Sequence, residues 1–341
     1  MEANYGILAL IPPVVAIGLC FATKQVLISM FAGLFAGALV ISNWNPFAAA
    51  SYSLDALATN MADNVVLLLF TLFMGVGIAF IWRLGGSYAL AEAAKRRFKK
   101  RRSVCLGTWG LGMVCSVNDC LVAAVDGNVF RDICKDYRIS SEKFSYVLDS
   151  TAAPAAAFFI SDWIAYQISM IGQGLDMAGI TGITPVSAYI NGLPFNMYSI
   201  FTLIFVGMMM YTGRDYGPML KAEVRALTTG QFTSPTAKPM LDVGSELGEA
   251  KKTKPMIMCF VLPIVIAFAI IIAGILYTGI TNPDRSGTGI MAILDACDAQ
   301  KALYWGSFGM AVTGIVLALA TRIMTFEETM TTIVDGFKLM S

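Results

Sequence analysis

The sequence predicts an all-α polytopic membrane protein, and two features of its composition lead to that prediction. Of its 341 residues, 57% are hydrophobic and only 14% are charged, whereas a soluble chain carries about 25% charged residues. The chain also contains apolar runs close to the roughly 20 residues that a helix needs to cross a bilayer. We expect about seven transmembrane helices, near residues 7–22, 26–41, 65–82, 158–171, 194–211, 256–277 and 302–320. The first run lacks a basic leader and a small-residue cleavage site, so we interpret it as a span.

The distribution of basic residues predicts the orientation of these helices. Segments 43–64 and 172–193 contain no Lys or Arg, whereas 83–102 contains eight, 131–143 contains four and 214–254 contains seven. Because cytoplasmic loops are enriched in Lys and Arg, we assign the basic segments to the cytoplasm, which places 22 of the 24 basic residues inside. The expected protein is a multi-pass protein of the cell (cytoplasmic) membrane with its N-terminus outside.

This orientation creates a constraint on residues 104–128, which lie between two basic segments. The segment is too short for two full spans at 1.5 Å per residue, yet both of its ends are expected in the cytoplasm. Its middle is rich in Gly and polar residues. We therefore expect a re-entrant hairpin, with Asn118 and Asp119 near its deepest point, covered by protein or water.

A second polar break is expected in a helix over residues 145–171. Asp149, Ser150 and Thr151 precede a run of small residues that contains Pro154, and a further carboxylate, Asp162, follows. A helix interrupted at membrane depth frees backbone carbonyls, which coordinate ions together with nearby polar side chains. The alternative is that Ser150 or Thr151 only caps a helix, with Asp149 at the membrane interface.

The stretch NDCLVAAVDGNVFRDICKDYRISSEKFSYVLDSTAAPAAAFFISDW resembles the NhaC-type Na⁺/H⁺ antiporter family. The matching pieces are Asn118-Asp119, Arg131-Asp132, the ISSEK run at 139–143 and the DSTAAP run at 149–154. The opening helices are similar to those of the family as well. The resemblance implies a secondary transporter of the ion-transporter superfamily that exchanges Na⁺ for H⁺, with Asp119 and Asp149-Ser150-Thr151 at the ion site beside Asn118.

Two departures from the family pattern affect this expectation. Asn118 stands where the family usually has an acid, so two adjacent carboxylates cannot share a proton here. The second titrating group is then Asp126, Asp149 or Asp162, or the chain carries another cargo. The alternatives are a Na⁺- or H⁺-coupled transporter of an organic solute such as an amino or carboxylic acid, and a truncated or partner-dependent membrane subunit.

The second departure concerns length and predicts how the chain is organised. Members of the family run well beyond this chain, which we expect to end within an internal repeat. Residues 1–212 form the first repeat, 213–255 a cytoplasmic linker with little fixed structure, and 256–341 the incomplete start of a second, inverted repeat. A homo-oligomer or a partner that supplies the missing half is then expected.

The remaining composition excludes several classes of function. The chain contains no His, so His-based metal sites and catalytic triads are excluded and proton coupling falls on carboxylates. We expect no enzyme and no cofactor, no metal other than transported Na⁺, and no nucleic-acid partner. The expected partners are the lipid bilayer and the transported ions or a small solute.

Overall fold

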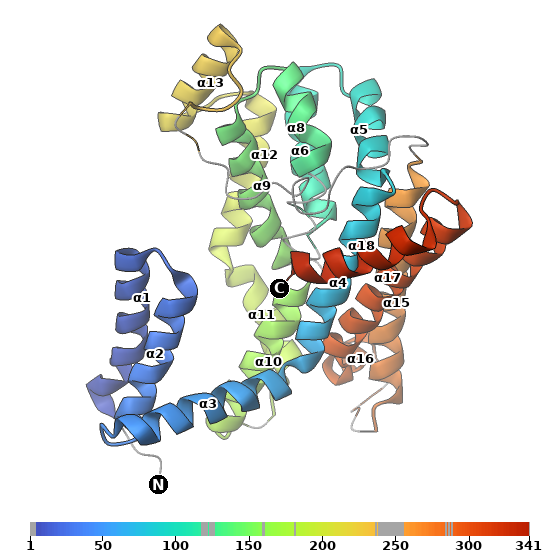
Figure 1. Cartoon of the computed structure of the whole chain (residues 1–341). Helices are drawn as coiled ribbons and strands as arrows, with labels where there is room; N and C mark the ends of the chain where they lie inside the picture. Colours follow the sequence, from blue (N-terminus) through green and yellow to red (C-terminus); the bar gives the residue numbers. More distant parts are fainter. Residues whose placement is uncertain are drawn as a thin grey trace. The chain divides into compact units, whose positions relative to one another are not determined.

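The computed structural model describes residues 5–116, 122, 127–158, 161–180, 182–235, 237, 256–283, 285, 287 and 289–340. Contacts divide the chain into two compact units, Met1–Val65 and Val66–Ser341. Every regular element in the described part is a helix. Figure 1 shows these helices within each unit.

The first unit is a helical hairpin followed by a third helix. Lys24 adopts a left-handed conformation (φ 56°) and donates its N–H to Cys20 O, which ends the first long helix. Gly33 allows the next helix to pack directly against Pro12 and Ala16. Asn45 then caps the third helix by accepting from two backbone N–H groups. The elements are η1 (Gly6–Leu10), α1 (Ile11–Thr23), α2 (Val26–Ile41) and α3 (Pro46–Asp63).

The second unit begins at α4 and contains the rest of the described helices. Its elements are α4 (Val65–Arg83), α5 (Gly86–Arg97), α6 (Arg101–Val114), α8 (Gly127–Asp136), α9 (Ser141–Ala156), α10 (Asp162–Met177), α11 (Pro185–Gly192), η3 (Leu193–Phe195), α12 (Met197–Thr212), α13 (Gly217–Thr229), α15 (Met258–Thr281), α16 (Ile290–Ala296), α17 (Ala299–Ala320) and α18 (Phe326–Leu339).

Small residues bring α4, α15, α17 and α18 into close contact. A side chain at Gly306 would overlap Ile271 of α15, and one at Gly314 would overlap Phe80 of α4. Helix α18 crosses α4 where Gly336 meets the backbone of Val76. Such small-residue contacts are the usual packing mode of helices in a bilayer, where apolar burial alone does not favour association.

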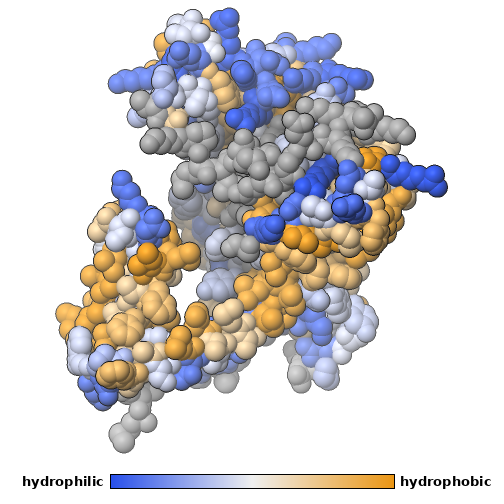
Figure 2. Space-filling view, viewed as in Figure 1, coloured by the Kyte–Doolittle hydropathy of each residue, from blue (hydrophilic) through white to orange (hydrophobic). Residues whose placement is uncertain are grey.

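Basic residues of the described segments at the ends of α5 and α8 and on α13 lie at one end of the second unit. Lys95 at the end of α5 pairs with Asp136 at the end of α8 (3.1 Å). Tyr137 donates a hydrogen bond to Phe98 O (3.0 Å), so the residues just after α5 and just after α8 lie side by side. Figure 2 shows hydrophilic side chains over this end, around α5, α8 and α13.

The described helices agree with the expected spans only in part. Four are long and apolar enough to cross a membrane: Gly6–Thr23, Val65–Arg83, Met258–Thr281 and Ala299–Ala320. A fifth span results if the pair Pro185–Phe195 and Met197–Thr229, bent by 49°, counts as one. The helices that correspond to the runs at 26–41 and 158–171 are α2 and α10, each of 16 residues, so the expected number of seven is not established.

The crossing of α4 and α18 yields a test of the packing. We expect Gly336→Ala to destabilise the protein by about 1–3 kcal/mol, because the added methyl group meets backbone atoms that cannot move independently. Gly174→Ala is the matched control, because a Cβ there meets nothing within 4 Å and Ala favours a helix over Gly. Thermal unfolding in detergent measures the stability of both variants. Equal melting temperatures for the two would contradict the observed crossing.

Candidate functional site

Three of the expected site residues lie inside a continuous helix rather than at a break. Ser140 caps α9 by accepting from Lys143 N (3.3 Å), and the helix continues through Asp149, Ser150 and Thr151 to Ala156. The expectation of a non-helical break at these residues is wrong. Pro154 removes only its own N–H bond to the carbonyl of residue 150, so the N–H bonds of residues 149–151 to the preceding turn are unaffected.

The helix places these side chains on different faces. Asp149 is exposed, whereas Ser150 is 8% exposed and Thr151 is fully buried. Successive residues of a helix are rotated by about 100°, so Asp149 and Thr151 point in nearly opposite directions. The structure therefore does not bring the three side chains into the coordination shell of a single ion. Asp149 makes no hydrogen bond or ion pair with any described residue.

The Thr151 hydroxyl has an unusual environment. Its Oγ1 is buried and has no hydrogen-bond partner within the described part of the chain. Buried helical threonines elsewhere in the second unit donate to the carbonyl four residues back, as Thr108 does to Val104 O (3.2 Å). An unsatisfied buried hydroxyl costs about 1–3 kcal/mol. A ligand that contacts the Thr151 hydroxyl oxygen, such as a cation, would offset this cost.

The interruption itself lies after Ala156, within the segment 145–171. Ser161 Oγ donates to Ala156 O (2.6 Å) and accepts from Ile164 N (3.2 Å), which connects the end of α9 to the start of α10. Tyr189 of α11 donates to Ala157 O (2.7 Å). Side chains therefore satisfy backbone groups that the break frees, as a break at membrane depth requires.

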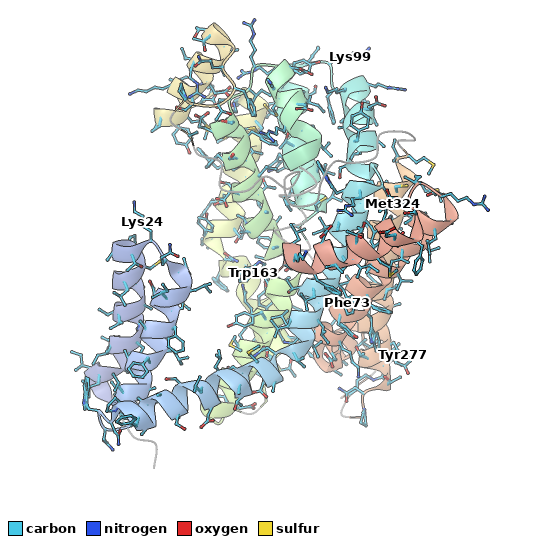
Figure 3. The ribbon with its side chains drawn as sticks, in the orientation of Figure 1. Lys24, Phe73, Lys99, Trp163, Tyr277 and Met324 are labelled. Carbon is cyan, nitrogen blue, oxygen red and sulfur yellow. The ribbon has the colours of Figure 1, made fainter. Side chains whose placement is uncertain are left out.

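The break lies away from the charged end of the second unit. In Figure 3, Lys99 marks that end, at the turn between α5 and α6, while Trp163 in the first turn of α10 lies about midway along the unit. Helix α10 begins at Asp162, the secondary candidate, whose side chain lies outside the described residues. Asn118, Asp119 and Asp126 also lie outside the described part, so their position relative to Pro154 and Asp149 stays a prediction.

A buried ion cluster at the start of α9 was not expected from the sequence. Lys143 is 1% exposed, and its Nζ lies 2.6 Å from Asp215 Oδ1 and 3.7 Å from Glu223 Oε2. Glu223, itself 2% exposed, also pairs with Arg101 of α6 and accepts from Ser140 N (2.7 Å). Each buried charge thus faces an opposite charge, which is the condition for keeping it in a protein interior.

This cluster attaches α13 to the start of α9. Arg225 of α13 forms two hydrogen bonds with Glu142 (2.9 and 2.7 Å), and Ser141 N donates to Phe232 O (2.9 Å). The expectation of a 213–255 linker with little fixed structure is therefore wrong for its first half. Pro218 in the first turn and Gly230 as the C-cap are standard helix-boundary signals that could have revealed α13.

The fold and the interrupted helix are typical of one class of protein. A bundle of apolar helices that contains an interrupted helix, with side chains pairing the freed backbone, is the architecture of helical membrane transporters.

Comparisons with known proteins agree with that class. The model of the Na⁺/H⁺ antiporter family matches residues 156–341, from the last residue of α9 onward, and the chain belongs to this family. The chain is 28% identical, over 350 aligned positions, to an uncharacterized protein of Haemophilus influenzae. That alignment covers 100% of this chain and 65% of the relative, so the chain spans less than two thirds of the relative's length. No solved structure matches the chain.

The ion cluster predicts a specific sensitivity of stability to charge removal. We expect Glu223→Gln to lower the free energy of unfolding by about 3–5 kcal/mol, because it leaves Lys143 and Arg101 without their shared carboxylate in a buried setting. Arg225→Gln serves as a comparison: its pair with Glu142 is partly exposed and contributes about 1 kcal/mol or less. Thermal unfolding in detergent and proteolysis within 213–255 measure the difference, and a wild-type melting temperature for Glu223→Gln would contradict the role of the cluster.

Proposed function

We propose that this chain is part of a secondary transporter of the NhaC type that exchanges Na⁺ for H⁺ across the cell membrane. Its membership of the Na⁺/H⁺ antiporter family is the observation that carries the proposal. The family is one of Na⁺/H⁺ antiporters, which supports ion exchange over coupled transport of an organic solute. The resemblance of the 118–154 region to the NhaC type supports the finer assignment.

We place the ion site on α9, just before its interruption. Asp149 is the exchanging carboxylate in this proposal, because a carboxylate without a partner at membrane depth is costly unless Na⁺ or H⁺ neutralises it. Ser150 and Thr151 lie on the buried side of the same turn, so in this proposal they supply a separate neutral oxygen position beside the exchanging carboxylate rather than ligands in the shell of Asp149. Asn118 and Asp119, with Asp126 as a further acid, complete the site from the preceding hairpin. Hard cations take oxygen ligands of these kinds.

The repeat organisation remains part of the proposal. Helices α1 and α2 pack together and are followed by α3, and α15 and α17 pack together and are followed by α18. Apart from the short α16 between α15 and α17, this similar order supports a first repeat over residues 1–212 and the start of a second over 256–341; the inversion of the second repeat is proposed from the charge pattern. An outside N-terminus and a cytoplasmic 213–255 linker follow from the same charge-based orientation.

The orientation can be tested at exposed positions that flank the 104–128 segment. In a background without native cysteines, Lys99→Cys and Lys135→Cys should both react with a membrane-impermeant thiol reagent only after the inner face is opened. Ile183→Cys, which lies in an exposed loop without nearby basic residues, should react from outside. Labelling of Lys99→Cys and Lys135→Cys from opposite sides would contradict the re-entrant hairpin.

The ion site predicts different results for two substitutions on α9. Asp149→Asn should abolish Na⁺-driven pH changes in vesicles, because an amide has no charge to exchange between Na⁺ and H⁺. Thr151→Val should leave the stability unchanged or raise it, because it removes an unsatisfied buried hydroxyl, yet it should weaken apparent Na⁺ affinity. The protein is expressed for this assay together with any further part of its transporter.

Asp176→Asn is the matched control, because it removes an exposed carboxylate near the end of α10. It should leave exchange at the wild-type level. Wild-type exchange by Asp149→Asn, with unchanged Na⁺ affinity and pH profile, would remove Asp149 from the ion site. Unchanged Na⁺ affinity in Thr151→Val would remove Thr151 from the ion site and leave the assignment of Asp149 in place.

A further inference from the structure

An apolar groove lies between α5, α6 and α8, near the charged end of the second unit. Its volume is about 780 Å³, within the range of about 300–1,000 Å³ that is usual for small-molecule sites. Apolar side chains and glycines form most of its wall. The lining residues are Leu90, Ala93, Ala94, Arg97, Phe98, Ser103, Leu106, Gly107, Gly110, Leu111, Val114, Val129 and Phe130.

One face of α6 forms the long wall of this groove. Ser103, Gly107, Gly110 and Val114 recur at intervals of three or four residues, the spacing of a single helix face. The eleven residue steps from Ser103 to Val114 correspond to about 16 Å along the helix. A side chain at Gly110 would meet nothing within 4 Å, and Val114 at the far end is 61% exposed. The rings of Phe98 and Phe130 lie against Gly107, so the described residues leave the apolar face of α6 uncovered from Gly110 to Val114.

The opposite end of the groove carries unpaired positive charge. Arg97 is part of the lining, and Arg96, Lys99 and Lys100 are exposed beside it. The other basic residues of this run are engaged: Lys95 with Asp136, Arg101 with Glu223, and Arg102 over the ring of Tyr211. Within the described part of the chain, no carboxylate pairs with the four remaining cations.

We propose that this groove binds an anionic phospholipid, with an acyl chain along α6 and the phosphate at Arg97. An apolar wall that ends in clustered cations matches the two halves of such a lipid. Cation clusters at the cytoplasmic ends of membrane helices attract anionic headgroups, and the Arg guanidinium suits phosphate oxygens. An apolar protein segment in the groove would leave the four cations unneutralised, so charge complementarity favours the lipid.

The test compares lipids and variants by thermal stabilisation of the delipidated, detergent-purified full chain. Phosphatidylglycerol should raise the melting temperature of the wild type more than phosphatidylcholine with the same acyl chains. Gly110→Leu should abolish this difference, because its Cβ meets nothing within 4 Å and the rest of the side chain fills the open part of the groove. Arg97→Gln should weaken the apparent affinity for phosphatidylglycerol roughly fivefold, the effect of losing one cation near an anionic headgroup.

Lys221→Gln is the matched control, because it removes an exposed positive charge on α13, outside both the groove lining and the four-cation cluster. Wild-type binding by this variant together with loss in Gly110→Leu supports the groove. Equal stabilisation by the two lipids, or full selectivity in Gly110→Leu, would overturn the proposal. A change of oligomeric state in Gly110→Leu without any lipid effect would also overturn it, since it would assign the groove to a second copy. Native mass spectrometry of the same samples reports bound lipid and oligomeric state together.

Discussion

The helical interruption after Ala156 is the constraint on which the second unit depends. In a bilayer no water is available to pair freed backbone groups, so a break between α9 and α10 requires partners from the protein. Ser161 supplies one bond to each side of the interruption, and Tyr189 supplies another from α11. These bonds also determine where α11 must lie. The loop before α11 is fixed in turn through Thr184, which donates to Asp295 of α16 (2.6 Å).

The two ends of α9 are thus held by different kinds of interaction. Neutral hydrogen bonds surround its C-terminal interruption, whereas a buried ion cluster holds its N-terminal turn against α6 and α13. Removing one member of such a cluster is costly, although an apolar replacement of the whole set can be equally stable. The cluster is therefore best understood as defining which surface α13 docks on. It connects the segment after α12 directly to the helix that carries Asp149.

The sequence predicts the helical membrane class, the clustering of basic segments and the existence of several spans, because these depend on composition and on local apolar length. It does not predict which face of α9 each residue occupies, since the DSTAAP pattern gives no information on the neighbours of Asp149 or Thr151. It also misplaces the break, because the loss of the one backbone hydrogen bond from position 154 to the carbonyl of Ser150 leaves α9 continuous to Ala156. Lys143 and Glu223 are 80 positions apart in the chain, and their pairing requires the tertiary fold. The candidate residues Asn118, Asp119 and Asp126 lie outside the described residues and remain predictions.

In the proposed mechanism, Na⁺ and H⁺ compete for a carboxylate on the interrupted helix. Equilibrium binding of radioactive Na⁺ to the purified transporter, measured across a series of pH values, tests it most directly. Competition for a single carboxylate predicts that the apparent Na⁺ dissociation constant rises about tenfold for each unit of pH below the pKa of that group. A dissociation constant that does not change with pH, or no saturable Na⁺ binding at any pH, would contradict the claim.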